Sequence, residues 1–161
     1  MQTAEDVMGD KTMPVTGGCL CGAVRYESSD PPHDVSYCHC RMCQRSSGNA
    51  FGMFASFRRD AFRFTRGEPK LYKSSAFAER GFCAECGTPL IFWYLTPGPL
   101  SEEIGVPIGS LDHPEDASPK SHWGIESQMP WLTIHDDLPR KRTEEDPNFI
   151  AHSTAIERGK K

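Results

Sequence analysis

The sequence has no apolar run long enough to cross a membrane and no extended basic stretch. A membrane-spanning helix needs about 20 mostly apolar residues, and the mean hydropathy here is −0.53. The longest basic run is Arg140-Lys141-Arg142, acidic residues follow it directly, and the formal net charge is −4. A protein that binds nucleic acid is expected to present a basic face. We therefore expect neither a membrane nor a nucleic acid as a partner.

A secretion signal and a disulfide framework are also missing. Residues 1–16 show no basic segment followed by an apolar one, the pattern of a signal peptide. The seven cysteines are an odd number at very short spacings, and a disulfide within Cys-x-Cys would be strained. These features predict a cytoplasmic protein whose reduced thiols are available to bind metal.

Three of the cysteines lie within six residues, in the pattern Cys-x-Cys-x-x-Cys formed by Cys38, Cys40 and Cys43. Thiolates are soft ligands that suit zinc, and three so close together can bind one ion. A structural zinc has four protein ligands, whereas a catalytic zinc has three and keeps one position open. No fourth cysteine lies near this group in sequence, which favours an open, catalytic site. The alternative is a structural site completed by His39 or by a nearby carboxylate.

The other four cysteines form two short pairs, Cys19-x-Cys21 and Cys83-x-x-Cys86, each next to glycine. The simplest assignment joins the pairs in one four-cysteine structural zinc site. Another grouping, in which Cys19 and Cys21 share a metal with one cysteine of the triad, would split the compact triad. The expected content is therefore two zinc ions per chain.

Frequent turn signals predict a mainly β fold with short peripheral helices in a single domain. The chain has 14 glycines and 13 prolines, which suits short strands better than long helices. We expect a flexible tail over residues 1–16, a zinc-binding domain over 17–139, and a tail or short helix over 140–161. Alternating or continuous apolar segments predict strands near residues 23–27, 35–38, 51–57, 62–64, 71–73, 90–95 and 106–111. Pro107 indicates an edge position for the last of these.

Several residues near the cysteines are candidates for a second role. Arg41 and Arg45 flank the triad and could offset its charge or hold a substrate carboxylate, and otherwise are ordinary surface residues. The pair Asp136-Asp137 could supply a base or simply form an acidic turn. Aromatic residues that could line a pocket, or pack in the core, are Phe51, Phe54, Phe92, Trp93, Trp123 and Trp131.

The motifs together resemble one known family. Gly-Gly-Cys-x-Cys-Gly from Gly17, Cys-x-Cys-x-x-Cys-Gln from Cys38, and Phe-Cys-x-x-Cys-Gly-Thr-Pro-Leu from Phe82 occur in this order. They are similar to the motifs of the glutathione-dependent formaldehyde-activating enzyme (Gfa) family, and the likeness extends to about Pro139. The resemblance implies an Mss4-like β fold, a structural zinc on the four-cysteine set and a catalytic zinc on the triad.

The function that this resemblance implies is a zinc-dependent carbon–sulfur lyase similar to S-(hydroxymethyl)glutathione synthase. Its substrates would be a small thiol such as glutathione and a small aldehyde such as formaldehyde. A zinc module without catalytic activity, which binds a protein partner, is the alternative. A metal at Cys38, Cys40 and Cys43 with a ligand from outside the protein would favour the enzyme.

Overall fold

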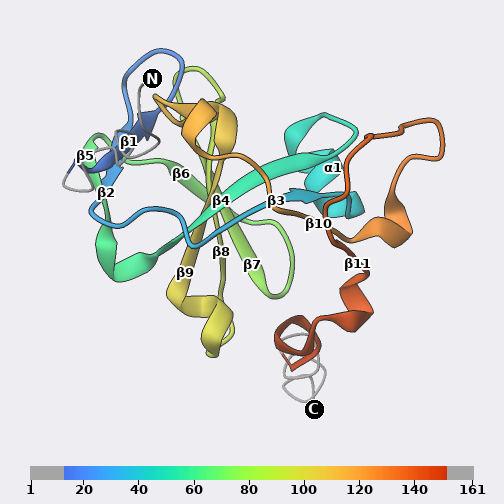
Figure 1. Cartoon of the computed structure of the whole chain (residues 1–161). Helices are drawn as coiled ribbons and strands as arrows, with labels where there is room; N and C mark the ends of the chain where they lie inside the picture. The colour runs from blue at the N-terminus through green and yellow to red at the C-terminus, as the bar shows by residue number, and fades with distance from the viewer. Residues whose placement is uncertain (1–12, 152–161) are drawn as a thin grey trace, which may run out of the picture.

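A large mixed sheet and a small antiparallel sheet form the framework of the protein (Figure 1). The computed structural model describes residues 13–151. The large sheet has the spatial order β11 (Arg140–Lys141), β10 (Ser121–Trp123), β3 (Asp34–Cys38), β4 (Gly52–Arg58), β9 (Glu103–Pro107), β8 (Pro89–Tyr94), β7 (Ala78–Phe82), β6 (Lys70–Lys73). The small sheet has the order β1 (Val15–Gly18), β2 (Arg25–Ser28), β5 (Phe62–Arg66). The expected mainly β fold is confirmed.

Helices are short and lie at the periphery, as expected. The α-helix α1 (Arg41–Ser47) begins directly after Cys40 and ends at Gly48, whose φ of 64° is left-handed. A second helical turn covers residues 147–151. Single turns of 3-10 helix are η1 (Arg59–Ala61), η2 (Pro99–Glu102), η3 (Ile108–Ser110), η4 (Pro114–Asp116), η5 (Ile125–Ser127) and η6 (Thr143–Glu145). No helix within residues 13–151 is long and apolar enough to span a membrane.

The main core lies between the two sheets. The apolar and aromatic run that predicted a buried strand near residues 51–57 forms β4, where Ala55 and Phe57 are fully buried. Tyr26 of β2 is buried as well, and its hydroxyl lies 2.7 Å from Ser110 Oγ. This hydrogen bond satisfies both hydroxyls inside the core. The apolar faces of both sheets therefore share one interior.

The expectation that Pro107 marks an edge strand is wrong. Strand β9 lies inside the large sheet, between β4 and β8. Pro107 is its last residue and is paired with Phe54 of β4, whereas β9 pairs with β8 through Gly105, opposite Phe92. Pro107 lies beyond that pair, where a missing N–H is tolerated at the end of a strand.

Strand β10 is added to the large sheet from far along the chain. It runs parallel to β3, with His122 opposite Tyr37 and Trp123 opposite Cys38. On its other side it pairs with β11, which lies in the segment expected to be a tail. At the other end, β1 already includes Val15. Regular structure thus extends past both expected boundaries of the 17–139 domain, while residues 1–12 and 152–161 lie outside the described part.

Candidate metal centre and its cavity

The two cysteine pairs meet where the small sheet touches the large one. Cys19 and Cys21 lie in the turn after β1, and Cys83 and Cys86 in the turn between β7 and β8. Their four sulfur atoms all lie within 4.8 Å of one another. Four convergent thiols form a complete tetrahedral donor set, so the cluster could hold a metal ion that ties the two sheets together.

Local hydrogen bonds orient and activate this four-cysteine cluster. The Val24 amide donates to Cys19 Sγ at 3.2 Å, and Thr88 Oγ1 lies 3.1 Å from Cys86 Sγ. Hydrogen bonds from Thr88 lower the pKa of the Cys86 thiol to about 6. The chain turns back after each pair at Gly22 and Gly87, both with φ of 76°. That conformation suits glycine, which explains the glycine beside each pair.

The second cluster consists of Cys38, Cys40 and Cys43. Cys38 ends β3, Cys40 caps the N-terminus of α1, and Cys43 lies in its first turn. Their sulfur atoms lie within 4.8 Å of one another, and all three residues are buried. Hydrogen bonds from the Cys38 and Cys43 thiols hold the pKa of Cys40 near 3, with help from the Cys43 and Met42 amides. The same contacts raise the pKa of the Cys38 thiol, and the pKa of Cys43 is raised as well. Without metal, the cluster therefore favours a thiolate at Cys40, which is the form that binds metal.

No fourth protein donor joins this triad within residues 13–151. The cluster contains three sulfur atoms and no histidine or carboxylate within the same distance. The soft donor set fits a metal such as zinc, and an ion held there would keep one position open. The regrouping that splits the triad does not occur, because its three thiols lie together and Cys19 and Cys21 lie with Cys83 and Cys86.

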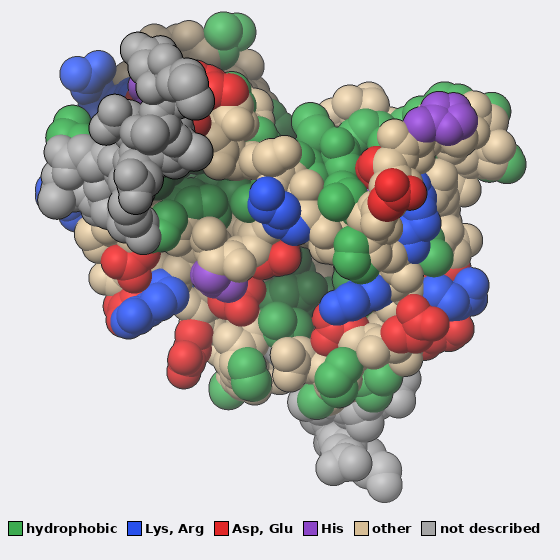
Figure 2. All heavy atoms as spheres, viewed as in Figure 1, with side chains coloured by type: hydrophobic (Ala, Val, Ile, Leu, Met, Phe, Trp, Pro, Cys, Tyr) green, Lys and Arg blue, Asp and Glu red, His purple; other side chains and the backbone are tan. Residues whose placement is uncertain are grey.

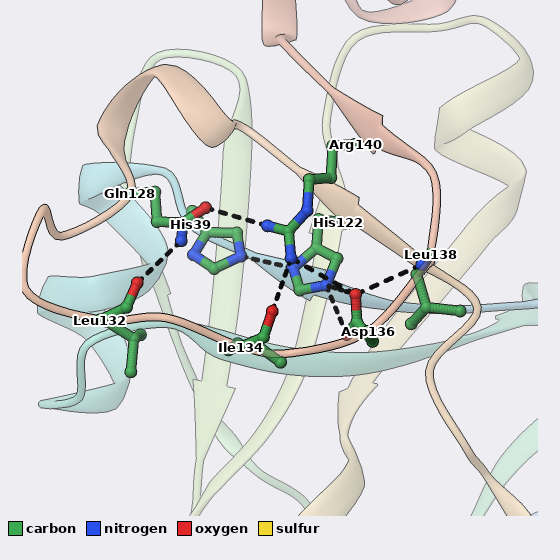
Figure 3. Close-up of polar contacts among 8 residues, drawn as sticks. All are labelled: His39, His122, Gln128, Leu132, Ile134, Asp136, Leu138 and Arg140. Atoms are coloured by element: carbon green, nitrogen blue, oxygen red, sulfur yellow. Dashed lines mark hydrogen bonds and ion pairs between the residues drawn. The ribbon is translucent and has the colours of Figure 1, made fainter.

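His39 lies between two of these cysteines in sequence, but its side chain contacts His122 and is not part of the cysteine cluster (Figure 3). Its Nε2 is 2.8 Å from Nδ1 of His122, and the two rings stack at 5.1 Å. Both histidines are fully buried. Burial lowers the pKa of His39 to about 4. His39 therefore belongs to a packed hydrogen-bond chain and does not complete the triad.

The chain continues from His122 to the protein surface. His122 Nε2 lies 2.9 Å from Asp136 Oδ2, and Arg140 donates to Asp136 Oδ1 at 3.3 Å (Figure 3). The hydrogen bond from His122 lowers the pKa of the Asp136 carboxyl. Because this carboxylate accepts from Nε2–H of His122, Nδ1 of that ring must accept from Nε2–H of His39. Asp136 thus fixes the tautomers of both rings, while its neighbour Asp137 is exposed.

Arg41 and Arg45 are exposed and lie outside the cavity described below. Arg41 donates to the side-chain oxygen of Gln44. Gln44 in turn donates to the carbonyl of His39 at 2.7 Å and to that of Ser127 at 2.9 Å. Arg41 accordingly helps to brace the metal loop from outside.

A cavity of about 280 Å³ opens beside the triad, and all three of its cysteines belong to the wall. Four of the six candidate aromatic residues also line it: Phe54, Phe92, Trp93 and Trp123. Phe51 instead packs edge-on against Tyr37 at 5.4 Å, and Trp131 is 71% exposed. Figure 2 shows a hollow on this face with hydrophobic side chains in its depth and charged side chains around it. Most small-molecule sites combine an apolar wall with a few polar groups in this way.

Arg80 is the residue that the sequence pattern did not reveal. It lies on β7, is 7% exposed, and lines the cavity with the triad. Its Nη2 is 3.5 Å from Cys43 Sγ, and its guanidinium lies over the Phe92 ring at 4.7 Å. The signal that could have pointed to Arg80 is a charged residue within a strand whose other residues are buried or half-buried. The sequence could not show that β7 and the triad face the same cavity.

Comparison with known proteins identifies the class that this fold and these clusters define. The model of the glutathione-dependent formaldehyde-activating enzyme family matches residues 14–127, so the chain belongs to that family. It is 36% identical over 78 residues to an uncharacterized lyase of Schizosaccharomyces pombe. That match covers 48% of this chain and 56% of the relative, so it spans only about half of the curated protein.

A solved structure of a Rhodobacter sphaeroides protein is also similar. It aligns with a TM-score of 0.49 at 22% identity, over 78% of this chain and 99% of the other. The family relationship agrees with the resemblance seen in the cysteine motifs.

Proposed function

We propose that the protein is a zinc-dependent carbon–sulfur lyase that forms or cleaves the adduct of a small thiol and a small aldehyde. In this proposal Cys19, Cys21, Cys83 and Cys86 hold a structural zinc, and the triad holds a catalytic one. The family name suggests glutathione and formaldehyde as substrates. The observation that carries the proposal is the buried three-sulfur cluster, which has no fourth donor among residues 13–151 and opens on a cavity.

A zinc ion at the triad would supply a soft Lewis acid with an open position, at which a thiol loses its proton more readily. The protein's own part is to hold and enclose the reactants. Buried sulfur atoms and the rings of Phe54 and Phe92 exclude water from the inner wall, which strengthens electrostatic interactions there. The hydrogen-bond chain from His39 to Asp136 keeps the metal loop in place.

The overall reaction balances without a redox partner. The thiol sulfur forms a bond to the carbonyl carbon as the thiol proton leaves to solvent. The π electrons of the carbonyl move to its oxygen, which takes a proton from water to give an S-hydroxymethyl product. Cleavage of the adduct runs through the same changes in reverse.

The proposal is tested by following carbon-13 formaldehyde and glutathione by NMR. The protein loaded with two zinc ions should accelerate exchange between free aldehyde and adduct above the spontaneous rate, and Cys40→Ser should remove that acceleration. A fully metal-loaded protein that accelerates no thiol–aldehyde pair would contradict the proposal. The non-catalytic module for a protein partner would then be the better hypothesis.

A further inference from the structure

Arg80 carries a buried positive charge that has no acidic partner in the described part of the chain. The side chain is 7% exposed, and none of the ion pairs found within residues 13–151 includes it. A buried cation is costly unless a charge or several acceptors compensate it. Something other than a protein carboxylate must therefore make this position favourable.

The contacts of Arg80 hold its guanidinium in place but use little of its hydrogen-bonding capacity. Nη2 donates to Cys43 Sγ at 3.5 Å. The guanidinium lies between the Phe92 ring at 4.7 Å and the Phe54 ring at 5.9 Å, which fixes its orientation. Its Nε is buried and has no partner. Of five N–H donors in the group, one therefore serves the triad and others are left for a ligand.

Arg80 is the buried cationic side chain of the cavity wall, since Lys141 in the same wall is exposed. It lines the same cavity as Cys38, Cys40 and Cys43. The acidic residues of that cavity, Asp34, Glu103 and Asp146, are each exposed or half-buried. Buried charges are less screened by solvent than exposed ones. An anionic atom placed deep in the cavity would thus meet the guanidinium before it met a carboxylate.

We propose that Arg80 is a catalytic residue that binds the oxyanion formed on the aldehyde oxygen when the carbon–sulfur bond is made. This inference rests on the proposed function. The N–H groups of Arg80 accept no electrons and lose no proton, because a guanidinium stays charged in proteins. They stabilise the negative oxygen until water protonates it, and they hold the same oxygen during cleavage of the adduct. Arg80 would therefore select thiols or thiol adducts that carry an oxygen close to sulfur, where that oxygen is negatively charged or becomes so during the reaction.

A simpler role is also consistent with the contact to Cys43. Three thiolates around a divalent ion leave a net charge of about −1. In the simpler role, Arg80 balances that charge and does not bind the substrate. In that case its removal would change metal retention but would not change the preference for one thiol over another. The two roles therefore predict different effects of removing Arg80 on the preference for one thiol over another.

The test compares mercaptoacetate with ethanethiol on the cobalt-substituted full chain. Mercaptoacetate carries a carboxylate one carbon from sulfur, and ethanethiol has a methyl group there. Dissociation constants are read from the sulfur-to-cobalt charge-transfer band. The wild type should bind mercaptoacetate roughly tenfold or more tightly than ethanethiol, as a charge-assisted hydrogen bond predicts. In Arg80→Met this ratio should fall close to one, while ethanethiol binding is retained.

Two further variants make the result specific. Arg80→Lys should keep part of the preference, since it retains the charge but loses the planar donor array. Arg63→Met is the matched control, because Arg63 pairs with Glu27 on the small sheet and does not line the cavity. It should keep the full ratio. If Arg80→Met does not fold, Arg80→Lys and the wild-type ratio decide the question.

The outcomes separate this inference from the proposed function. One contrary outcome is that the wild type binds ethanethiol as tightly as mercaptoacetate. Another is that Arg80→Met still binds mercaptoacetate more tightly. Either result would show that Arg80 does not bind the oxyanion. If neither thiol changes the spectrum of a protein with metal at the triad, the proposed function itself fails, and the inference fails with it.

Discussion

Nε2 of His39 donates to Nδ1 of His122 at 2.8 Å, across a sequence separation of 83 residues. His39 lies between two cysteines of the triad, and His122 lies on the strand added parallel to β3. The backbone repeats the connection, because the His39 amide donates to the carbonyl of Trp123 at 2.8 Å. The metal loop is therefore held by a remote segment through both a side chain and the main chain.

The first prediction concerns that histidine pair. His122→Phe keeps a ring that can stack on Tyr37 but removes the hydrogen bonds to His39 and Asp136. Leaving the buried His39 without its partner should lower the free energy of unfolding by about 1–3 kcal/mol. Denaturant unfolding of the metal-loaded protein measures this loss. Asp136→Ala should also be destabilising, whereas Asp137→Ala, at an exposed neighbouring residue, should be close to neutral. Equal effects of the two alanine variants would contradict the assigned role of Asp136.

The second prediction concerns the close approach of Gly124 to the metal loop. Gly124 has φ of 71°, and a Cβ added there would lie 3.0 Å from the Cys40 nitrogen and 3.2 Å from its Cβ. Gly124→Ala should therefore displace the backbone of Cys40 and weaken metal retention at the triad. The matched control is Gly48→Ala, where φ is 64° and a Cβ meets nothing within 4 Å.

Gly48→Ala should show only the cost of placing alanine in the left-handed conformation, about 1–2 kcal/mol of stability. Its metal content should be unchanged. Competition with a chelator, followed by metal analysis of each variant, provides the measurement. If both alanine variants retain the second metal equally well, contact with Cys40 has no influence on the triad.

The third prediction separates the two cysteine clusters. Cys86→Ser removes a ligand from the cluster that joins the small sheet to the large one, so loss of that metal should unfold much of the domain. In small zinc peptides, metal binding contributes on the order of 10 kcal/mol to folding. Cys40→Ser should leave a folded protein with one metal and no activity. Thermal unfolding and metal stoichiometry of the two variants would reveal the difference, and equal loss of stability would argue against the division of roles.

The fourth prediction is a pH dependence at the junction of the two sheets. Arg25 and Thr16 of the small sheet both donate to Asp112, which follows η3. The hydrogen bond from Arg25 is the main cause that lowers the pKa of the Asp112 carboxyl. A carboxyl with a lowered folded pKa stabilises the protein above its unfolded pKa, about 3.9, and this contribution disappears as pH falls through the folded value.

Asp112→Asn should therefore be less stable than the wild type at neutral pH, by up to about 1 kcal/mol for a partly exposed pair. The difference should shrink as pH falls below about 4. Urea unfolding of both proteins over this range gives the difference directly. If the difference in the free energy of unfolding between the two proteins stayed constant at the lowest pH measured, the charge of Asp112 would not contribute to stability.

The sequence revealed the cysteine clusters because metal ligands at short spacings form local patterns. Cys38, Cys40 and Cys43 are brought together by one strand end and the first turn of α1. The two pairs were grouped with each other because the alternative grouping would split the compact triad, and their four sulfur atoms do lie together. Several strands were also visible in local patterns, as the alternation before Glu27 illustrates for β2 and the apolar run before Arg58 for β4.

Contacts between distant strands were not visible in the sequence. Arg80 reaches Cys43 only because β7, β8, β9, β4 and β3 lie in this order across the sheet. Local proximity pointed instead to Arg41 and Arg45, which are exposed and do not line the cavity. The interior position of β9 escaped prediction for the same reason, since its neighbours are set by the sheet and not by Pro107.

The position of β10 has a consequence for synthesis of the chain on the ribosome. The four-cysteine cluster has all its ligands once Cys86 has emerged, and the two sheets can then be clipped together. The triad has its three thiols much earlier, at Cys43, but the strand that supports them ends at Trp123 and the carboxylate that fixes His122 comes at Asp136. During translation the triad is thus a set of nucleophilic thiols on an unsupported loop, exposed to oxidants and to any available metal. The support for the triad is complete only after the chain has been made as far as Asp136.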